Sequence, residues 1–185
     1  MMKFCEVRFY FAVVIAGAAI LFSPTARAEL QTVPFVDLTK FVGDWYQISH
    51  IPQWFEGGNC ACARQRLTVD AKPNVVDVFN SCNDDDARGR QKTIQGEATN
   101  TDLRTNSKFS VDFHLGFLGT YWVIGLDPEY RFAVVSDQDQ FSLYILSKTP
   151  TLAPKLYQRA LALAAKQLDV TKLVETDQKD CSYPQ

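Results

Sequence analysis

The chain has 185 residues, with 19 Lys and Arg against 21 Asp and Glu, so its formal net charge is −2. A mildly acidic chain without a basic patch argues against nucleic acid or an anionic membrane as a partner. This length suits one domain with a sizeable core.

Residues 1–28 have the pattern of a secretory signal peptide. Lys3 and Arg8 give a positive start, residues 9–22 are uncharged and mostly apolar, and Ala26-Arg27-Ala28 is a small-residue cleavage signal. The apolar run is about 14 residues, short of the roughly 20 that span a bilayer, and no cysteine stands at its end for lipid attachment. We therefore expect residues 29–185 to form a single exported domain, periplasmic or extracellular, with no integral membrane association.

The first predicted strand of the remaining chain, 43–50, begins with Gly43-Asp44-Trp45-Tyr46. Gly43 allows the backbone to bend or to approach another segment closely. Trp45 is a large apolar group with one N–H that needs a partner. Taken alone, the pair indicates a core tryptophan at the start of a strand.

Short apolar runs separated by turn residues continue to Lys148 and predict an all-β domain. Successive strands with short connections favour an up-and-down barrel of eight strands, in which closure removes the exposed edges. Turn residues gather at 70–74, 83–89 and 136–140. The predicted strands are 43–50, 61–70, 74–82, 91–99, 107–114, 119–127, 130–136 and 140–148.

Alternation indicates which side chains face the barrel interior. Phe109, Val111 and Phe113 alternate with polar residues, as Val76 and Val78 do around Asp77. Residues 121–124 are apolar on both sides, so one face fills the barrel and the other lies under a helix.

One amphipathic helix is predicted after the strands. Thr151 is its expected N-cap, and Pro154 falls in the first turn. Leucines and Ala160 recur at helical spacing as far as Leu168, where we expect the helix to end. Residues 170–176 could add a last strand.

Four cysteines follow the signal peptide: Cys60, Cys62, Cys82 and Cys181. In an exported chain they predict two disulfides, for which three pairings are possible. The alternative is a metal site at Cys60-Ala61-Cys62. Zinc sites usually space such cysteines more widely, and neither histidine lies nearby in sequence, so disulfides are favoured and no metal is expected.

Three stretches together resemble the lipocalin family, in particular the branch of bacterial lipocalins and apolipoprotein D. They are Gly43–Tyr46 followed by Ile51-Pro52, the strand–turn–strand segment Tyr121–Ala133, and Tyr144–Pro150. The resemblance covers nearly the whole chain after the signal peptide. It implies a cavity that is open at one end and closed at the other by the first motif.

The resemblance also implies roles for particular residues. The family usually has an Arg stacked on the motif tryptophan; here Lys148 is expected over Trp45, with a weaker contact. Bacterial relatives often carry a lipid-modified cysteine that is missing here. The disulfides implied are Cys62–Cys181 and Cys60–Cys82.

The expected cavity lining mixes apolar and aromatic side chains with a few polar groups. Trp122 and Tyr144 match aromatic cavity positions of this branch, whereas the other apolar positions could equally be plain barrel core. Gln65 and Tyr144 are the polar candidates, and Trp54 and Phe55 form either a lip or a loop folded onto the barrel. The apolar candidates are Leu67, Val78, Phe109, Phe113, Trp122, Ile124 and Tyr144.

No catalytic pattern supports an enzyme. His50 and His114 stand in no catalytic or metal-binding motif, paired cysteines leave no thiol free, and Asp84-Asp85-Asp86 fits a solvated turn better than a calcium loop. The predicted function is binding and transport of a small hydrophobic ligand, such as a fatty acid or a lysophospholipid-like molecule, by a monomer or weak dimer without a cofactor. The alternatives are a tetrapyrrole pigment as ligand, a lipid-modifying enzyme, and an interaction module that uses the apolar tip Leu115–Gly119.

Overall fold

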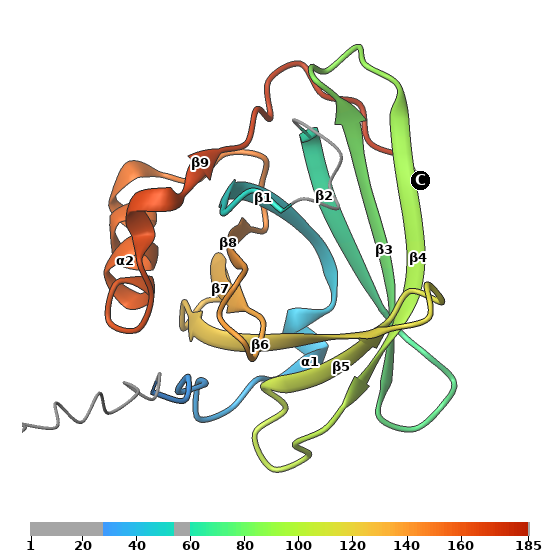
Figure 1. Cartoon of the computed structure of the whole chain (residues 1–185), viewed down its shortest axis with the longest axis vertical. Helices are drawn as coiled ribbons and strands as arrows, with labels where there is room; N and C mark the ends of the chain where they lie inside the picture. Colours follow the sequence, from blue (N-terminus) through green and yellow to red (C-terminus); the bar gives the residue numbers. More distant parts are fainter. Residues whose placement is uncertain (1–27, 54–59, 185) are drawn as a thin grey trace, which may run out of the picture.

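The computed structural model describes residues 28–53 and 60–184. Its strands and helices follow one another in the predicted order (Figure 1). A short helix precedes the first strand, and a short strand follows the long helix. The elements are α1 (Leu38–Phe41), β1 (Gly43–His50), β2 (Cys60–Val69), β3 (Val75–Asp84), β4 (Gln91–Asn100), β5 (Lys108–Asp112), β6 (Leu118–Leu126), β7 (Phe132–Ser136), β8 (Leu143–Ser147), α2 (Pro154–Ala164), the 3-10 turn η2 (Val170–Lys172) and β9 (Val174–Glu175).

Eight antiparallel strands close into a barrel, which confirms the predicted fold. Each strand from β2 to β7 pairs with the next, and β1 closes the barrel by pairing with both β8 and β2. The signal peptide was predicted for residues 1–28, of which 1–27 lie outside the described residues. Within 28–53 and 60–184, no helix combines the length and apolar character that crossing a membrane would require.

The last barrel strand begins later than predicted, at Leu143, because Asp137 holds a turn before it. The carboxylate of Asp137 accepts hydrogen bonds from the backbone N–H groups of Phe141 (3.2 Å) and Ser142 (2.5 Å). Residues 140–142 therefore belong to the connection and not to β8.

The first motif closes one end of the barrel. Trp45 is fully buried, and its Nε1–H donates to the carbonyl oxygen of Phe41 at 2.6 Å. Phe41 ends α1, a turn that the sequence analysis missed and that Asp37 caps through the backbone N–H of Thr39. Gly43 has a φ of +97°, a backbone conformation that favours glycine.

Lys148 lies over Trp45, where the resemblance places it. Its Nζ is 4.2 Å from the ring centroid and donates to the carbonyl oxygens of Val42 (2.7 Å) and Phe41 (3.2 Å). The ammonium thus ties β8 to the loop between α1 and β1 and covers the closed end.

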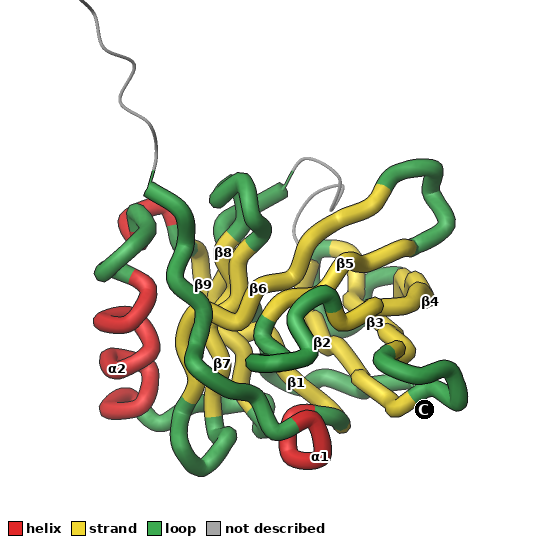
Figure 2. Tube along the Cα trace, turned by 90° about the horizontal axis from the view of Figure 1, so that it is seen from below, coloured by secondary structure: helices red, strands yellow, loops and turns green. Residues whose placement is uncertain are grey.

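Helix α2 packs on the outer wall formed by β6 and β7 (Figure 2). Its N-cap is Ala153 and not Thr151, and the α-helix ends at Ala164 and not near Leu168. Leu168 is nevertheless buried, because the chain continues in turns whose N–H groups bond back to the carbonyl of Ala164. The helical spacing of apolar residues therefore continues through the turns after Ala164, which is why it did not mark the end of the helix.

The seam between β1 and β2 is short. The two strands pair only over Gly43–Tyr46 and Arg64–Leu67, and the C-terminal tail lies across the next residues. The side-chain Nε2 of Gln178 donates to the carbonyl oxygens of Gln47 (2.8 Å) and Ala63 (2.7 Å), one on each strand. The tail thus bridges the strands just beyond their last pair.

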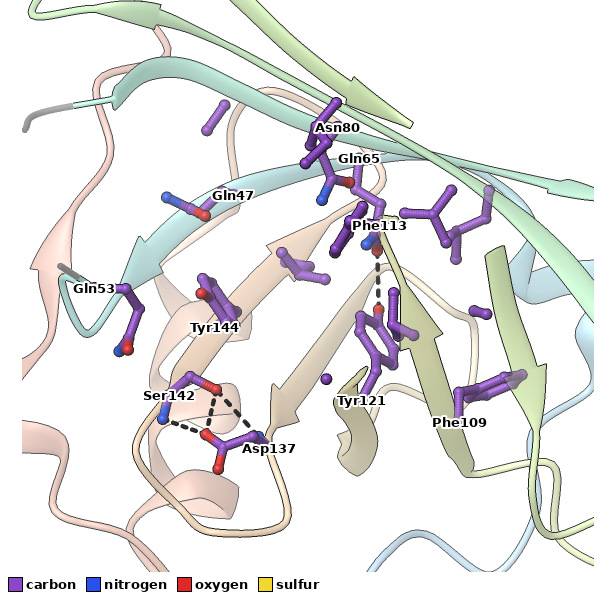
Figure 3. A pocket seen from close by; sticks show the side chains of 18 of the residues that line it. Gln47, Gln53, Gln65, Asn80, Phe109, Phe113, Tyr121, Asp137, Ser142 and Tyr144 are labelled. Carbon is purple, nitrogen blue, oxygen red and sulfur yellow. Dashed lines mark hydrogen bonds between the residues drawn. The ribbon is translucent and has the colours of Figure 1, made fainter. Parts of the chain in front are cut away.

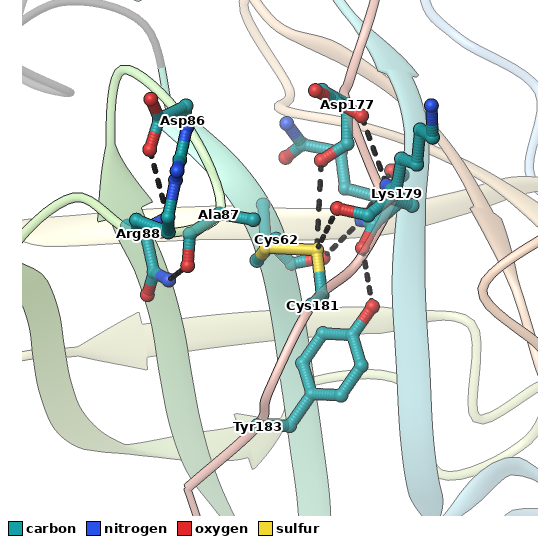
Figure 4. The surroundings of a disulfide bond; sticks show 12 residues. Cys62, Asp86, Ala87, Arg88, Asp177, Lys179, Cys181 and Tyr183 are labelled. Carbon is teal, nitrogen blue, oxygen red and sulfur yellow. Dashed lines mark hydrogen bonds between the residues drawn. A yellow bond between two sulfur atoms is a disulfide. The ribbon is translucent and has the colours of Figure 1, made fainter.

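Two disulfides join the predicted cysteines. Cys60 bonds to Cys82 across β2 and β3, and Cys62 bonds to Cys181 of the tail (Figure 4). This is the pairing that the resemblance implied. The second bridge is reinforced by the backbone N–H of Cys62, which donates to the carbonyl oxygen of Asp177 at 2.7 Å.

Candidate ligand-binding cavity

The barrel encloses a cavity of about 1140 Å³ that is lined mainly by apolar side chains. Six of the predicted lining residues lie on its wall, several of them visible in Figure 3. They are Leu67, Val78, Phe109, Phe113, Tyr144 and the polar Gln65. The alternation in β3 and β5 therefore gave the correct inward face.

Trp122 and Ile124 do not line the cavity, contrary to the prediction. Phe109 of β5 is the register partner of Tyr121, and Lys108 is the partner of Trp122. Register partners share a face of the sheet, so an inward Phe109 fixes Tyr121 inward and Trp122 outward. Outside the barrel, Lys108 Nζ sits 3.8 Å from the centroid of the Trp122 ring.

The outer face of β6 is covered by other parts of the chain. Trp122 and Ile124 belong to the apolar cluster between the barrel wall and α2, which also contains Leu30 and Ala160. The sequence could not select the inward face because residues 121–124 are apolar on both sides. The pairing with β5 carries that information.

Tyr121 is one of several cavity residues, Asn80 and Ala98 among them, that the sequence analysis missed. Its hydroxyl donates to Gln65 Oε1 at 3.0 Å across the interior, and burial raises the pKa of the phenol well above its ordinary value. The group therefore stays neutral and remains a hydrogen-bond donor. Counting register from Phe109 through the hairpin would have found it.

Exposed apolar side chains surround the open end. Leu115, Phe117 and Leu118 come from the connection between β5 and β6 and the start of β6, and Phe141 comes from the turn before β8. Each is more than half exposed, the most exposed being Phe141 at 71%. Trp54 and Phe55, the predicted lip, lie outside the described residues.

The two histidines lie outside any recognisable catalytic arrangement. His50 is buried, its ring is parallel to that of Tyr144 with centroids 6.4 Å apart, and its Nδ1 is 3.2 Å from Thr176 Oγ1. His114 is exposed and lies 3.6 Å from the Asp112 carboxylate. Among residues 28–53 and 60–184, no group of three or more His, Cys, Asp or Glu side chains is placed to hold a metal ion.

Comparisons with known proteins agree with this geometry. The family model described as a lipocalin-like domain matches residues 36–178. The outer membrane lipoprotein Blc of Escherichia coli strain K12 is 35% identical over 158 residues, 84% of this chain and 87% of that protein. The chain belongs to the lipocalin family.

Further lipocalins match over similar lengths. Mouse apolipoprotein D is 30% identical over 154 residues, which cover 78% of each chain. Insecticyanin from the tobacco hornworm Manduca sexta superimposes with a TM-score of 0.67 at 18% identity, over 87% of this chain and 92% of that chain. At that identity the second match supports the lipocalin fold alone. As a family, lipocalins bind small hydrophobic molecules inside such barrels.

Proposed function

We propose that this lipocalin binds and carries a small hydrophobic ligand in its barrel, such as a fatty acid or a lysophospholipid-like molecule. The observation that supports this is the apolar cavity of about 1140 Å³, which is closed at one end by Trp45 and flanked at the other by exposed apolar side chains. A cavity of this size lies slightly above the range of roughly 300–1,000 Å³ that is typical of small-molecule sites.

Burial of an apolar chain supplies the driving force. Each methylene removed from water contributes ~0.8 kcal/mol, so about ten of them contribute ~8 kcal/mol before the costs of association. Polar groups on the wall then discriminate among ligands of similar length.

The proposed place of action is outside the cytoplasm. The leader-like residues 1–28 and the two disulfides, Cys60–Cys82 and Cys62–Cys181, fit a chain that folds in an oxidising compartment. The relative Blc is named as an outer membrane lipoprotein, but this sequence has no cysteine at the end of its apolar run. We propose that the carrier acts in the periplasm or outside the cell.

Solvent extraction of the natively purified protein, followed by mass spectrometry, tests the proposal. We expect a bound amphiphile that a fluorescent apolar probe displaces. Ala98→Phe should reduce the amount bound, because Ala98 lines the cavity. Thr99→Phe is the matched control, because this neighbouring side chain on β4 is exposed.

Absence of any displaceable ligand would contradict the proposal. So would equal binding by the Ala98→Phe and Thr99→Phe variants, provided that both have the circular dichroism of the wild type. A visible absorption band in the purified protein would instead identify a pigment as the ligand.

A further inference from the structure

We propose that Gln65, Asn80 and Tyr121 form a polar subsite that binds a neutral hydroxyl group on an otherwise apolar ligand. The inference rests on the proposed binding of a small hydrophobic ligand and narrows it, because it favours a molecule with a neutral hydroxyl group over an ionised fatty acid. It concerns hydrogen bonding inside the cavity and not the apolar burial that any hydrophobic ligand would share.

The three side chains come from three strands and meet in the cavity (Figure 3). Gln65 of β2 and Asn80 of β3 are register partners, so their side chains are neighbours on one face of the sheet. Tyr121 of β6 reaches across and donates its hydroxyl proton to Gln65 Oε1 at 3.0 Å.

The carbonyl oxygen of Asn80 lacks a partner. Asn80 Oδ1 is buried, and no group in the described part of the chain donates a hydrogen bond to it. Buried polar atoms nearly always have a partner, and one without a donor destabilises the site. Almost none of this oxygen's surface is exposed, so the amide must rotate about χ2 to turn Oδ1 toward the cavity, where a donor on a bound molecule would supply the missing hydrogen bond.

The subsite also offers donors. Because Gln65 Oε1 already accepts from Tyr121, its amide NH₂ is the remaining polar group of that side chain, and Asn80 carries a second NH₂. A hydroxyl can both donate to Asn80 Oδ1 and accept from one of these amides. An ether or ester oxygen can only accept and would leave Asn80 Oδ1 unsatisfied.

The subsite lacks a charge to balance an ionised ligand. Gln65 and Asn80 are neutral, and burial raises the pKa of Tyr121 so that it stays a phenol. The charged residues that border the cavity are paired with other groups or exposed. Arg64 uses its two terminal nitrogens on Asp44 and the carbonyl oxygen of Pro184, while its buried Nε has no hydrogen-bond partner among the described residues. Lys92 pairs with Asp84, Asp137 with Ser142, and Asp139 is exposed. A carboxylate beside Asn80 would lose its hydration without a counter-ion, whereas a hydroxyl loses far less.

Three probes with the same ten-carbon chain separate these cases: 1-decanol, decyl methyl ether and ionised decanoate. Each is titrated against a fluorescent apolar probe bound to the wild-type protein and to Asn80→Leu. Because the affinity of each probe is compared between two proteins, the free energy of hydrating the free probe is the same in both and cancels. We expect Asn80→Leu to weaken 1-decanol about tenfold, the loss of roughly one or two buried hydrogen bonds, and to leave the ether unchanged or tighter.

Tyr157→Phe is the matched control, because it removes a hydroxyl that lies outside the cavity and donates to Ser49 Oγ at 3.2 Å. We expect it to bind 1-decanol within twofold of the wild type. Asn80→Ala is a second variant that removes the same amide with less bulk. The affinity for the ether reports whether either variant has kept its cavity.

The remaining outcomes decide against the inference in different ways. If Asn80→Leu weakens the binding of the alcohol and the ether equally, the ligand hydroxyl does not donate to Asn80 Oδ1. If the substitution weakens decanoate more than 1-decanol, the subsite does not select a neutral group. If all three probes bind and no substitution changes them, the subsite is refuted while the proposed function stands. If no probe binds to the wild type, the proposed function is refuted as well.

Discussion

Replacing Trp45 by Ala removes the side chain that closes one end of the barrel. Trp45 has 0% exposure and belongs to the core cluster, but it is not part of the cavity wall. The substitution should therefore lower stability without changing which ligand is bound.

The size of the effect follows from the buried area. A tryptophan buries about 150–250 Å², which at ~25 cal/mol per Å² corresponds to ~4–6 kcal/mol. Measured Trp→Ala changes in cores are about 3–5 kcal/mol. The lost indole hydrogen bond adds little, because Lys148 Nζ also donates to the carbonyl oxygen of Phe41. We expect a loss of about 4 kcal/mol in the free energy of unfolding.

Urea unfolding followed by far-UV circular dichroism measures this change. Trp45→Phe is the control: it keeps a ring under Lys148 and should lose less than half as much. A loss below about 1 kcal/mol for Trp45→Ala would refute the packing argument. A changed ligand preference with unchanged stability would place Trp45 on the ligand side of the barrel.

Three further predictions concern charges and the tail. Burial lowers the pKa of Lys148 to about 8, although Asp44 opposes the shift, so the Trp45 indole N–H signal in NMR spectra should titrate near pH 8. The unfolded lysine titrates near 10.5, so this group's contribution to stability rises with pH between these values. Hydrogen bonds from Arg131 lower the pKa of Asp127. The contribution of this carboxylate to the free energy of unfolding is therefore present above pH ~4 and is lost as the pH falls through the folded-state pKa. Asp127→Asn should lower stability by about 2 kcal/mol at pH 7 and by less in acid. Replacing Cys62 and Cys181 by Ser should cost about 2–5 kcal/mol, because their bridge spans 119 residues.

Each of these predictions has a result that would contradict it. An indole signal that titrates only near pH 10 would mean that Lys148 is well solvated. Equal acid sensitivity of Asp127→Asn and the wild type would remove that carboxylate from the pH dependence. For the disulfide, the control is the double Ser variant of Cys60 and Cys82, which form a bridge across a shorter loop. By the loop-entropy relation, removing this bridge should lower stability by ~1–2 kcal/mol less than removing Cys62–Cys181. A larger loss for the shorter loop would contradict the loop argument.

The eight barrel strands could be predicted because their turns are marked by local chemistry. Segments such as 70–74 and 83–89 combine Asp, Asn, Pro and Gly between alternating strands, and that signal needs no tertiary information. Alternation likewise placed Phe109 and Phe113 on the cavity wall, since one side of β5 is polar.

Other features of the fold depend on pairing between distant segments and could not be predicted from local sequence. Both faces of residues 121–124 are apolar, so the register with β5 was needed to show that Tyr121 and not Trp122 faces the ligand. The end of α2 was missed because Leu168 keeps the helical apolar spacing while its backbone has already turned. Helix α1 is too short for a periodic pattern, and its cap, Asp37, is visible only once Thr39 is known to bond to it.

The short seam between β1 and β2 has a consequence for biosynthesis. Successive strands from β2 to β8 can pair as soon as each leaves the ribosome or translocon, because each lies beside its predecessor. The carbonyl groups of Gln47 and Ala63 must wait for Gln178, which is made after all eight barrel strands. A chain stopped before this residue would contain all of the strands β1 to β9 and would lack the hydrogen bonds that join Gln47 to Ala63 through Gln178. The wall that retains a ligand is therefore finished only after the tail that follows the barrel strands has been made, and a premature stop before Gln178 should yield a leaky barrel and not an unfolded one.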